Sequence, residues 1–158
     1  LQSDQLYLIK STWEIPRAKP SASGEAILLR FFEKYPQNQN LFDAFRNTPL
    51  ESLKTSTRFK SHAGRIIKVF DRAVTMLEPN YDLKQFESIW GEVADSHFKI
   101  NIPKSSFFEL RDVALEVLTA VCNLDDKQQE AWNAFFDNIF HIIFTKMDEF
   151  EKEAKAKQ

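Results

Sequence analysis

Apolar residues recur at helical spacing along almost the whole chain, and this periodicity restricts the fold more than any other feature. One stripe near the start is formed by Leu6, Ile9 and Trp13, and similar stripes follow up to the one that contains Trp132. Only three glycines are present, which are few for the tight turns of a β-rich fold. We therefore expect an all-α fold of about eight helices in one domain, residues 1–158.

Prolines and capping residues mark where these helices begin and end. Pro16 is expected to end the first helix, because a proline inside a helix removes a hydrogen bond. Residues 1–2 and about 148–158 are expected to be frayed tails. The expected helix starts are, in chain order, Ser3, Ser21, Pro36, Pro49, Thr55 or Ser56, Asp82, Pro103 and Asp125.

Composition excludes several classes of function. The 21 basic and 23 acidic residues nearly balance, so charge does not indicate a nucleic-acid or anionic-membrane partner. Cys122 is the single cysteine, which excludes an intrachain disulfide and a cysteine-cluster metal site. No apolar run reaches the roughly 18 residues that a membrane-spanning helix needs.

Two histidines lie on the inward stripes of separate amphipathic segments. His62 shares its stripe with Phe59 and Ile66, and His97 follows one turn after Val93. Each imidazole should therefore point into the interior. Two inward imidazoles from different helices can face each other across a flat, iron-bearing ligand, so the pattern predicts a haem pocket.

At this point the sequence resembles the globin family, and among globins the insect type that includes the midge-larval haemoglobins. The resemblance covers Ser3 to about Met147 and implies a globin fold around one b-type haem. Two departures lie in connections: the stretch from His62 to His97 is longer than in vertebrate globins, and the run from His97 to Pro103 is one residue shorter. The landmarks that carry the resemblance are, in order, Trp13, Gly24, Pro36, Phe42, Phe45, His62 and His97.

His97 stands at the proximal position and is implied to be the axial ligand of the iron. Its second ring nitrogen needs a hydrogen-bond acceptor to fix the tautomer, and either Ser96 or the carbonyl of Val93 is placed to provide one. The alternative from the residues alone is a buried histidine that serves packing.

His62 stands at the distal position. An imidazole N–H can stabilise bound O2 by about 1.5–3 kcal/mol, as hydrogen bonds to charged groups do. Two alternatives stay open: His62 ligates the iron directly and gives a six-coordinate haem, or it swings out to solvent. Leu28 and Ile66 are expected to wall this side, and Leu28 brings no second polar donor.

Arg65 follows His62 by three residues and should lie at the rim of the pocket. It is expected to pair with a haem propionate, to reach the bound ligand, or to remain solvated. His141 is expected at the surface, and Cys122 as a packing residue. The resemblance implies an apolar cage around the haem, formed by Phe42, Phe45, Val93, Ile102, Phe107 and Leu110.

The implied function is reversible binding of O2, and also of CO and NO, for oxygen transport or storage without catalysis. The alternatives are a six-coordinate globin acting in NO or peroxide detoxification, a haem-based sensor, and a haem-free bundle. We expect a monomer or weak homodimer with no nucleic-acid or membrane partner. Leu1 is neither Met nor a small residue, which favours a secreted mature chain, with a trimmed, cytoplasmic chain as the alternative.

Overall fold

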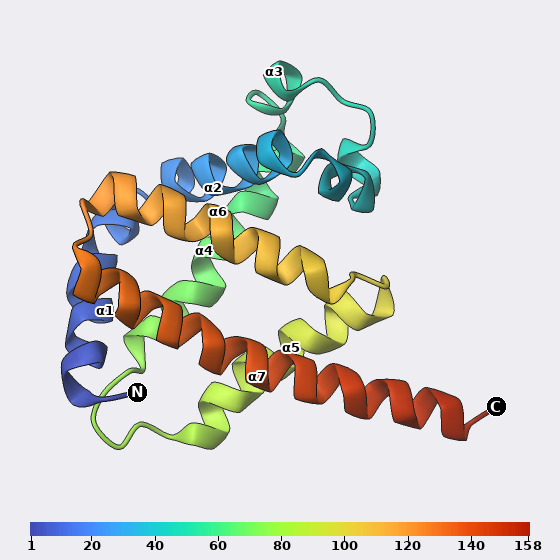
Figure 1. The fold of residues 1–158 in the computed structure, drawn as a ribbon. Helices are drawn as coiled ribbons and strands as arrows, with labels where there is room; N and C mark the ends of the chain where they lie inside the picture. The colour runs from blue at the N-terminus through green and yellow to red at the C-terminus, as the bar shows by residue number, and fades with distance from the viewer.

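The computed structural model describes all residues from 1 to 158 and contains helices only (Figure 1). Seven α-helices and two 3₁₀ helices follow each other, which confirms the expected all-α fold of about eight helices. Their bounds are α1 (Ser3–Ala18), α2 (Pro20–Lys34), η1 (Pro36–Leu41), η2 (Asp43–Phe45), α3 (Leu50–Leu53), α4 (Thr57–Thr75), α5 (Leu83–Lys99), α6 (Lys104–Cys122) and α7 (Asp126–Ala156).

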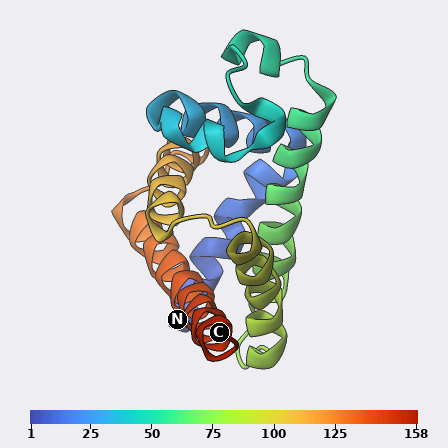
Figure 2. The ribbon, with the colours of Figure 1, turned by 90° about the vertical axis from the view of Figure 1, so that its right-hand side faces the viewer.

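The helices pack in two groups around the centre of the molecule. Figure 2 shows α6 and α7 on one side, α4 and α5 on the other, and α2 crossing at one end. Helix α2 packs on α4 and α6, α5 packs on α7, and α1 contacts α4, α6 and α7. This arrangement places α4 and α5, which carry the two histidines, opposite the inner faces of α6 and α7.

Side-chain caps fix the starts of three helices at expected positions. Ser56 accepts a hydrogen bond from the backbone N–H of Phe59, and Asp82 accepts two from the first turn of α5. Asp125 and Gln128 form a reciprocal pair at the start of α7, with distances of 2.8 and 2.9 Å. Each cap satisfies backbone donors that a helix start leaves without a partner.

Helix α1 does not end before Pro16, and this expectation is wrong. The helix continues to Ala18 with Pro16 inside it. Because proline has no N–H, the carbonyl of Thr12 lacks its helical donor. The thiol of Cys122 donates to that carbonyl at 3.5 Å, so a contact between α6 and α1 fills part of the gap.

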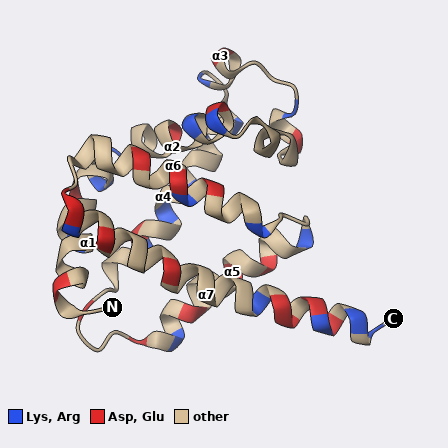
Figure 3. Cartoon of the chain, viewed as in Figure 1, with Lys and Arg blue, Asp and Glu red and all other residues tan.

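The C-terminal segment also differs from its expected frayed state, because α7 continues as a helix to Ala156. Lys104 pairs with Asp148 at 2.9 Å, and the rings of Phe98 and Phe150 lie 5.6 Å apart. Figure 3 shows basic and acidic residues alternating along this projecting end of α7. These contacts and charge pairs support helix beyond the point where the apolar stripe ends.

A single cluster of buried apolar side chains runs through the fold. Trp13 and Trp132 pack at its α1–α7 end, with ring centroids 5.8 Å apart. Val121, near the end of α6, lies outside this cluster and is 50% exposed. None of the helices combines the length and the apolar character that crossing a membrane requires.

Candidate functional site

Two adjoining cavities are both lined by residues of α4, α5 and α6. One has a volume of ≈ 90 Å³ and reaches toward α2 and η1. The other has a volume of ≈ 270 Å³ and reaches along α7. Both are bounded by both histidines, so we treat them as one site, and the residues that they share are His62, Ile66, His97, Phe107 and Leu110.

His97 is held in a fixed orientation by the last turns of α5. Its Nδ1 lies 2.7 Å from the carbonyl oxygen of Val93, and the Ser96 hydroxyl lies 3.2 Å from the same nitrogen. The ring of Phe107 packs against the imidazole with centroids 5.3 Å apart. The Nδ1 contact leaves the other ring nitrogen free to bind a metal. Burial lowers the pKa of His97, and its bond to Val93 opposes that shift.

His62 lies against the turn that joins η1 and η2. The Phe42 ring meets the imidazole edge-on, with centroids 4.8 Å apart and planes at 86°. Burial lowers the pKa of His62 to about 4, and the charges of Arg65 and His97 act in the same direction. The imidazole is therefore neutral near pH 7, and a neutral ring can donate an N–H or ligate a metal.

The expected site residues are brought together with one exception. Leu28, Phe42 and Ile102 line the smaller cavity, and Arg65 and Val93 line the larger one. Leu28 is 1% exposed, and its apolar side chain adds no polar donor to the site. Arg65 is exposed at the edge of the larger cavity, at the rim where the sequence placed it. His141 is exposed on α7, outside both cavities.

Phe45 is the exception, because it lines neither cavity. It is 3% exposed and lies behind Phe42, packed on the rings of Phe32 and Phe59 at 6.1 and 5.9 Å. Phe45 supports Phe42 and His62 from behind, with ring centroids 5.7 and 6.2 Å from theirs, and its expected place in the cage stays a prediction. Phe45 points toward α2 and α4, a direction that its spacing of three residues from Phe42 does not reveal.

The comparisons with known proteins agree with this geometry. A model of the globin family matches residues 25–143, which is most of the chain. This chain is a globin. A relative, "Globin CTT-VI" of Chironomus thummi thummi, is 27% identical over 148 residues, covering 94% of this chain and 89% of the relative.

Two solved insect structures share the fold of this globin. A hexa-coordinate haemoglobin of Drosophila melanogaster is 44% identical with a TM-score of 0.87, covering 91% of this chain and 94% of that one. The haemoglobin of the botfly Gasterophilus intestinalis is 34% identical with a TM-score of 0.88, covering 94% of this chain and 99% of that one. The expected resemblance to insect globins is thereby confirmed.

Haem is the cofactor of this globin, and the residues present fit it. Eleven of the sixteen residues around the larger cavity are hydrophobic, which suits an apolar macrocycle. The two imidazoles provide nitrogen donors of the kind that bind haem iron. Arg65 is exposed at the rim, and its guanidinium can bind a carboxylate of the macrocycle. The hydroxyl of Ser96, which is exposed beside His97, can do the same.

Sequence reasoning missed one polar pair in the wall of the smaller cavity, Asn38 and Ser106. The Ser106 hydroxyl donates to the Asn38 side-chain carbonyl at 2.6 Å, and the Asn38 amide donates to Glu109 at 3.2 Å. Asn38 is 1% exposed, so this pair ties η1 to α6 from inside the fold. Asn38 stands in a polar run, Gln37 to Asn40, which gave no signal of burial.

The far wall of the larger cavity was not among the expected site residues. Trp90 lines this wall, and its indole N–H is buried without a hydrogen-bond acceptor. Its ring meets Phe70 edge-on at 5.3 Å. The helical periodicity could have indicated the other residues of this wall, because they lie on the inward stripes of α4 and α7. These residues are Val69, Phe136, Ile139, Phe140 and Ile143.

Proposed function

We propose that this globin binds O2 reversibly at a b-type haem, for oxygen transport or storage, and catalyses no reaction. CO and NO bind at the same position in this proposal. The observation that carries it is that His62 and His97 line the same apolar cavity from two different helices. The domain in this proposal is the whole chain, residues 1–158.

His97 acts as the proximal iron ligand in this proposal. When haem is bound, its ferrous iron supplies the open coordination position at which a diatomic gas binds. The carbonyl of Val93 accepts the Nδ1–H of His97 and thereby fixes the ring orientation and raises the basicity of the other nitrogen. Phe107 packs on the imidazole and restricts its rotation.

On the distal side, His62 would donate an N–H to a gas bound at the haem. Its low pKa, caused mainly by burial, keeps the ring neutral at physiological pH, so one ring nitrogen remains available. Leu28 and Ile66 exclude water from this side without adding a second polar donor. A single distal donor supports reversible binding because O2 is stabilised only moderately.

A second candidate is a six-coordinate globin, in which His62 as well as His97 would hold the iron, acting in NO or peroxide detoxification or in sensing. The 44% identical Drosophila melanogaster protein, described as a hexa-coordinate haemoglobin, favours it. The shared lining of the cavities by both histidines is compatible with this form as well.

A visible absorption spectrum of the reduced, gas-free protein separates the two candidates. One broad band that splits on oxygenation supports the five-coordinate O2 carrier. Two sharp bands that collapse to one in His62→Leu support ligation by His62. The matched control is His141→Leu, which changes an exposed histidine on α7 and should leave the spectrum unchanged. Absence of a haem band after reconstitution would contradict both candidates.

A further inference from the structure

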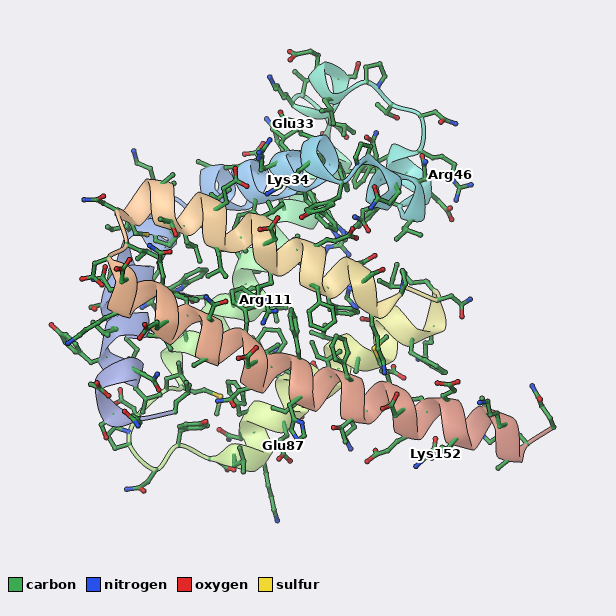
Figure 4. All side chains as sticks on the ribbon, viewed as in Figure 1. Glu33, Lys34, Arg46, Glu87, Arg111 and Lys152 are labelled. Atoms are coloured by element: carbon green, nitrogen blue, oxygen red, sulfur yellow. The ribbon has the colours of Figure 1, made fainter.

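The three tryptophans of the chain belong to one series of packed aromatic rings that begins at the larger cavity. Trp90 and Phe70 both line that cavity, and their ring centroids are 5.3 Å apart. The Phe70 ring lies 6.3 Å from the Trp13 ring, and the Trp13 ring lies 5.8 Å from that of Trp132. Side chains fill the space between α1, α4 and α7 (Figure 4). Ring contacts therefore lead without a break from the cavity wall to Trp13 on α1.

The indole N–H groups of the three tryptophans have different partners. The N–H of Trp90 is buried and has no acceptor. Trp132 donates to the neutral hydroxyl of Thr12 at 2.8 Å. Trp13 donates to the carboxylate of Asp71 at 2.9 Å. Of the three indoles, only that of Trp13 is hydrogen-bonded to a group that can take up its proton.

Asp71 connects the indole of Trp13 with solvent. Trp13 is 2% exposed, whereas 35% of the Asp71 side chain is accessible. Arg17 Nε lies 3.1 Å from the carboxylate oxygen that accepts the Trp13 N–H, and this ion pair holds the carboxylate in place. A proton that leaves the Trp13 indole can therefore pass through Asp71 to water. Neither Trp90 nor Trp132 has such a route.

This difference determines which tryptophan can be oxidised by one electron. An indole that loses an electron becomes a strong acid at its N–H, so the oxidised ring persists only where a base removes the proton. The base must lie within hydrogen-bond reach of the N–H. The Asp71 carboxylate meets this condition for Trp13. An oxidising equivalent that enters the ring series at the cavity should therefore settle on Trp13.

We propose that Trp13 supplies one electron when the haem-loaded protein reduces a peroxide. One H2O2 takes up two electrons and two protons and becomes two molecules of water. One electron comes from ferrous haem, which becomes ferric, and the other comes from the Trp13 indole through the packed ring of Phe70. The indole proton passes to Asp71 and on to solvent, and solvent provides the second proton. A neutral indolyl radical remains on Trp13.

The step occurs once per chain until an outside reductant restores Trp13, so it is not turnover by itself. It requires bound haem, but it requires neither reversible O2 binding nor a particular role of His62. The inference therefore applies to both candidate functions. Its effect is to move an oxidising equivalent away from the cavity and its two histidines to a ring beside a solvent-accessible acid.

Electron paramagnetic resonance of the ferrous, haem-loaded protein, frozen at a series of times after mixing with H2O2, tests the proposal. We expect a radical signal that narrows when the indole rings carry deuterium, which distinguishes tryptophan from tyrosine. Trp13→Phe should lose this signal. Trp132→Phe is the matched control, because it removes a buried tryptophan of the same ring series and should keep the signal. A tryptophan signal that survives in Trp13→Phe would overturn the proposal, and so would a wild-type protein without one.

Asp71→Asn tests the proton step separately. The amide keeps an acceptor for the Trp13 N–H but removes the negative charge, so the yield of the radical should fall. Glu14→Gln is the control, since Glu14 is an exposed acid that also pairs with Arg17 and does not bind the Trp13 indole. An unchanged yield in Asp71→Asn would overturn the proposal.

Peptide mapping of the wild-type chain after peroxide treatment in air needs no variant. Oxygen adds to an indolyl radical, so the added mass should lie on Trp13 and not on Trp90 or Trp132. Added mass on Trp90 alone would overturn the proposal. The CO spectrum of each variant verifies that haem is bound and the chain is folded. A protein that binds O2 reversibly but forms no tryptophan radical would contradict this inference alone and leave the proposed function intact.

Discussion

Gly24 of α2 lies so close to Ala63 of α4 that a Cβ atom on Gly24 would be 2.4 Å from the Ala63 carbonyl oxygen. Such a contact is far below a normal van der Waals distance, and the obstructing atom is backbone. The absence of a side chain at Gly24 therefore lets α2 and α4 cross closely. Because Ala63 follows His62 on α4, this crossing also affects the position of His62 at the site.

Gly24→Ala should destabilise the protein. The clash with the α4 backbone should cost about 1–3 kcal/mol, which exceeds the gain in helix propensity of at most about 1 kcal/mol. Gly64→Ala is the matched control, since nothing lies within 4 Å of a Cβ at that position and stability should rise. Urea unfolding measures both, and a Gly24→Ala protein as stable as the wild type would contradict the close crossing.

Thr12→Val should destabilise the contact between α1 and α7. The Thr12 hydroxyl accepts the indole N–H of Trp132 at 2.8 Å, and Trp132 is fully buried. Removal of the acceptor leaves a buried donor unsatisfied, which should lower the free energy of unfolding by about 1–3 kcal/mol. Thr12→Ser keeps the hydroxyl and should lose clearly less in the same thermal or urea unfolding experiment.

His97→Gly should lose haem during size-exclusion chromatography, and added imidazole should restore its binding. The variant removes the proposed axial nitrogen and leaves a space in which free imidazole fits beside Phe107. The Soret band and the haem content of the eluted protein are the measurements. His141→Gly on the exposed face of α7 should retain haem. Full retention by His97→Gly without imidazole would show that another residue holds the iron.

The haem-free protein should lose stability as the pH falls. Burial lowers the pKa of His62 from 6.5 to about 4, so between these values the unfolded chain binds more protons than the folded one. The free energy of unfolding should therefore decrease as the pH falls through this window. His62→Leu should flatten part of this dependence, whereas His141→Leu should not. An unchanged slope in His62→Leu would mean that His62 is solvated.

The positions of the two histidines were predictable because helical periodicity reports which way a side chain faces. His62 and His97 stand on apolar stripes, and both line the cavities. The start of α7 was predictable for a local reason too, since Asp125 and Gln128 need only each other to cap the helix. Features that are determined by residues within one turn of a helix can be predicted from the sequence.

Features that depend on contacts between distant segments were not predictable. The passage of α1 through Pro16 involves the thiol of Cys122, more than a hundred residues away. The burial of Asn38 in the cavity wall depends on Ser106 and Glu109 of α6. The direction of Phe45 was not predictable for the same reason, because Phe45 packs on Phe32 of α2 and Phe59 of α4.

The aromatic contacts of Phe107 connect the outside of the molecule with His97. The Phe107 ring lies 5.3 Å from His97 and 6.2 Å from Phe140, and Phe140 lies 5.4 Å from the exposed Phe108. Replacement of the exposed Phe108 should therefore alter the packing around His97 from a position that lines neither cavity.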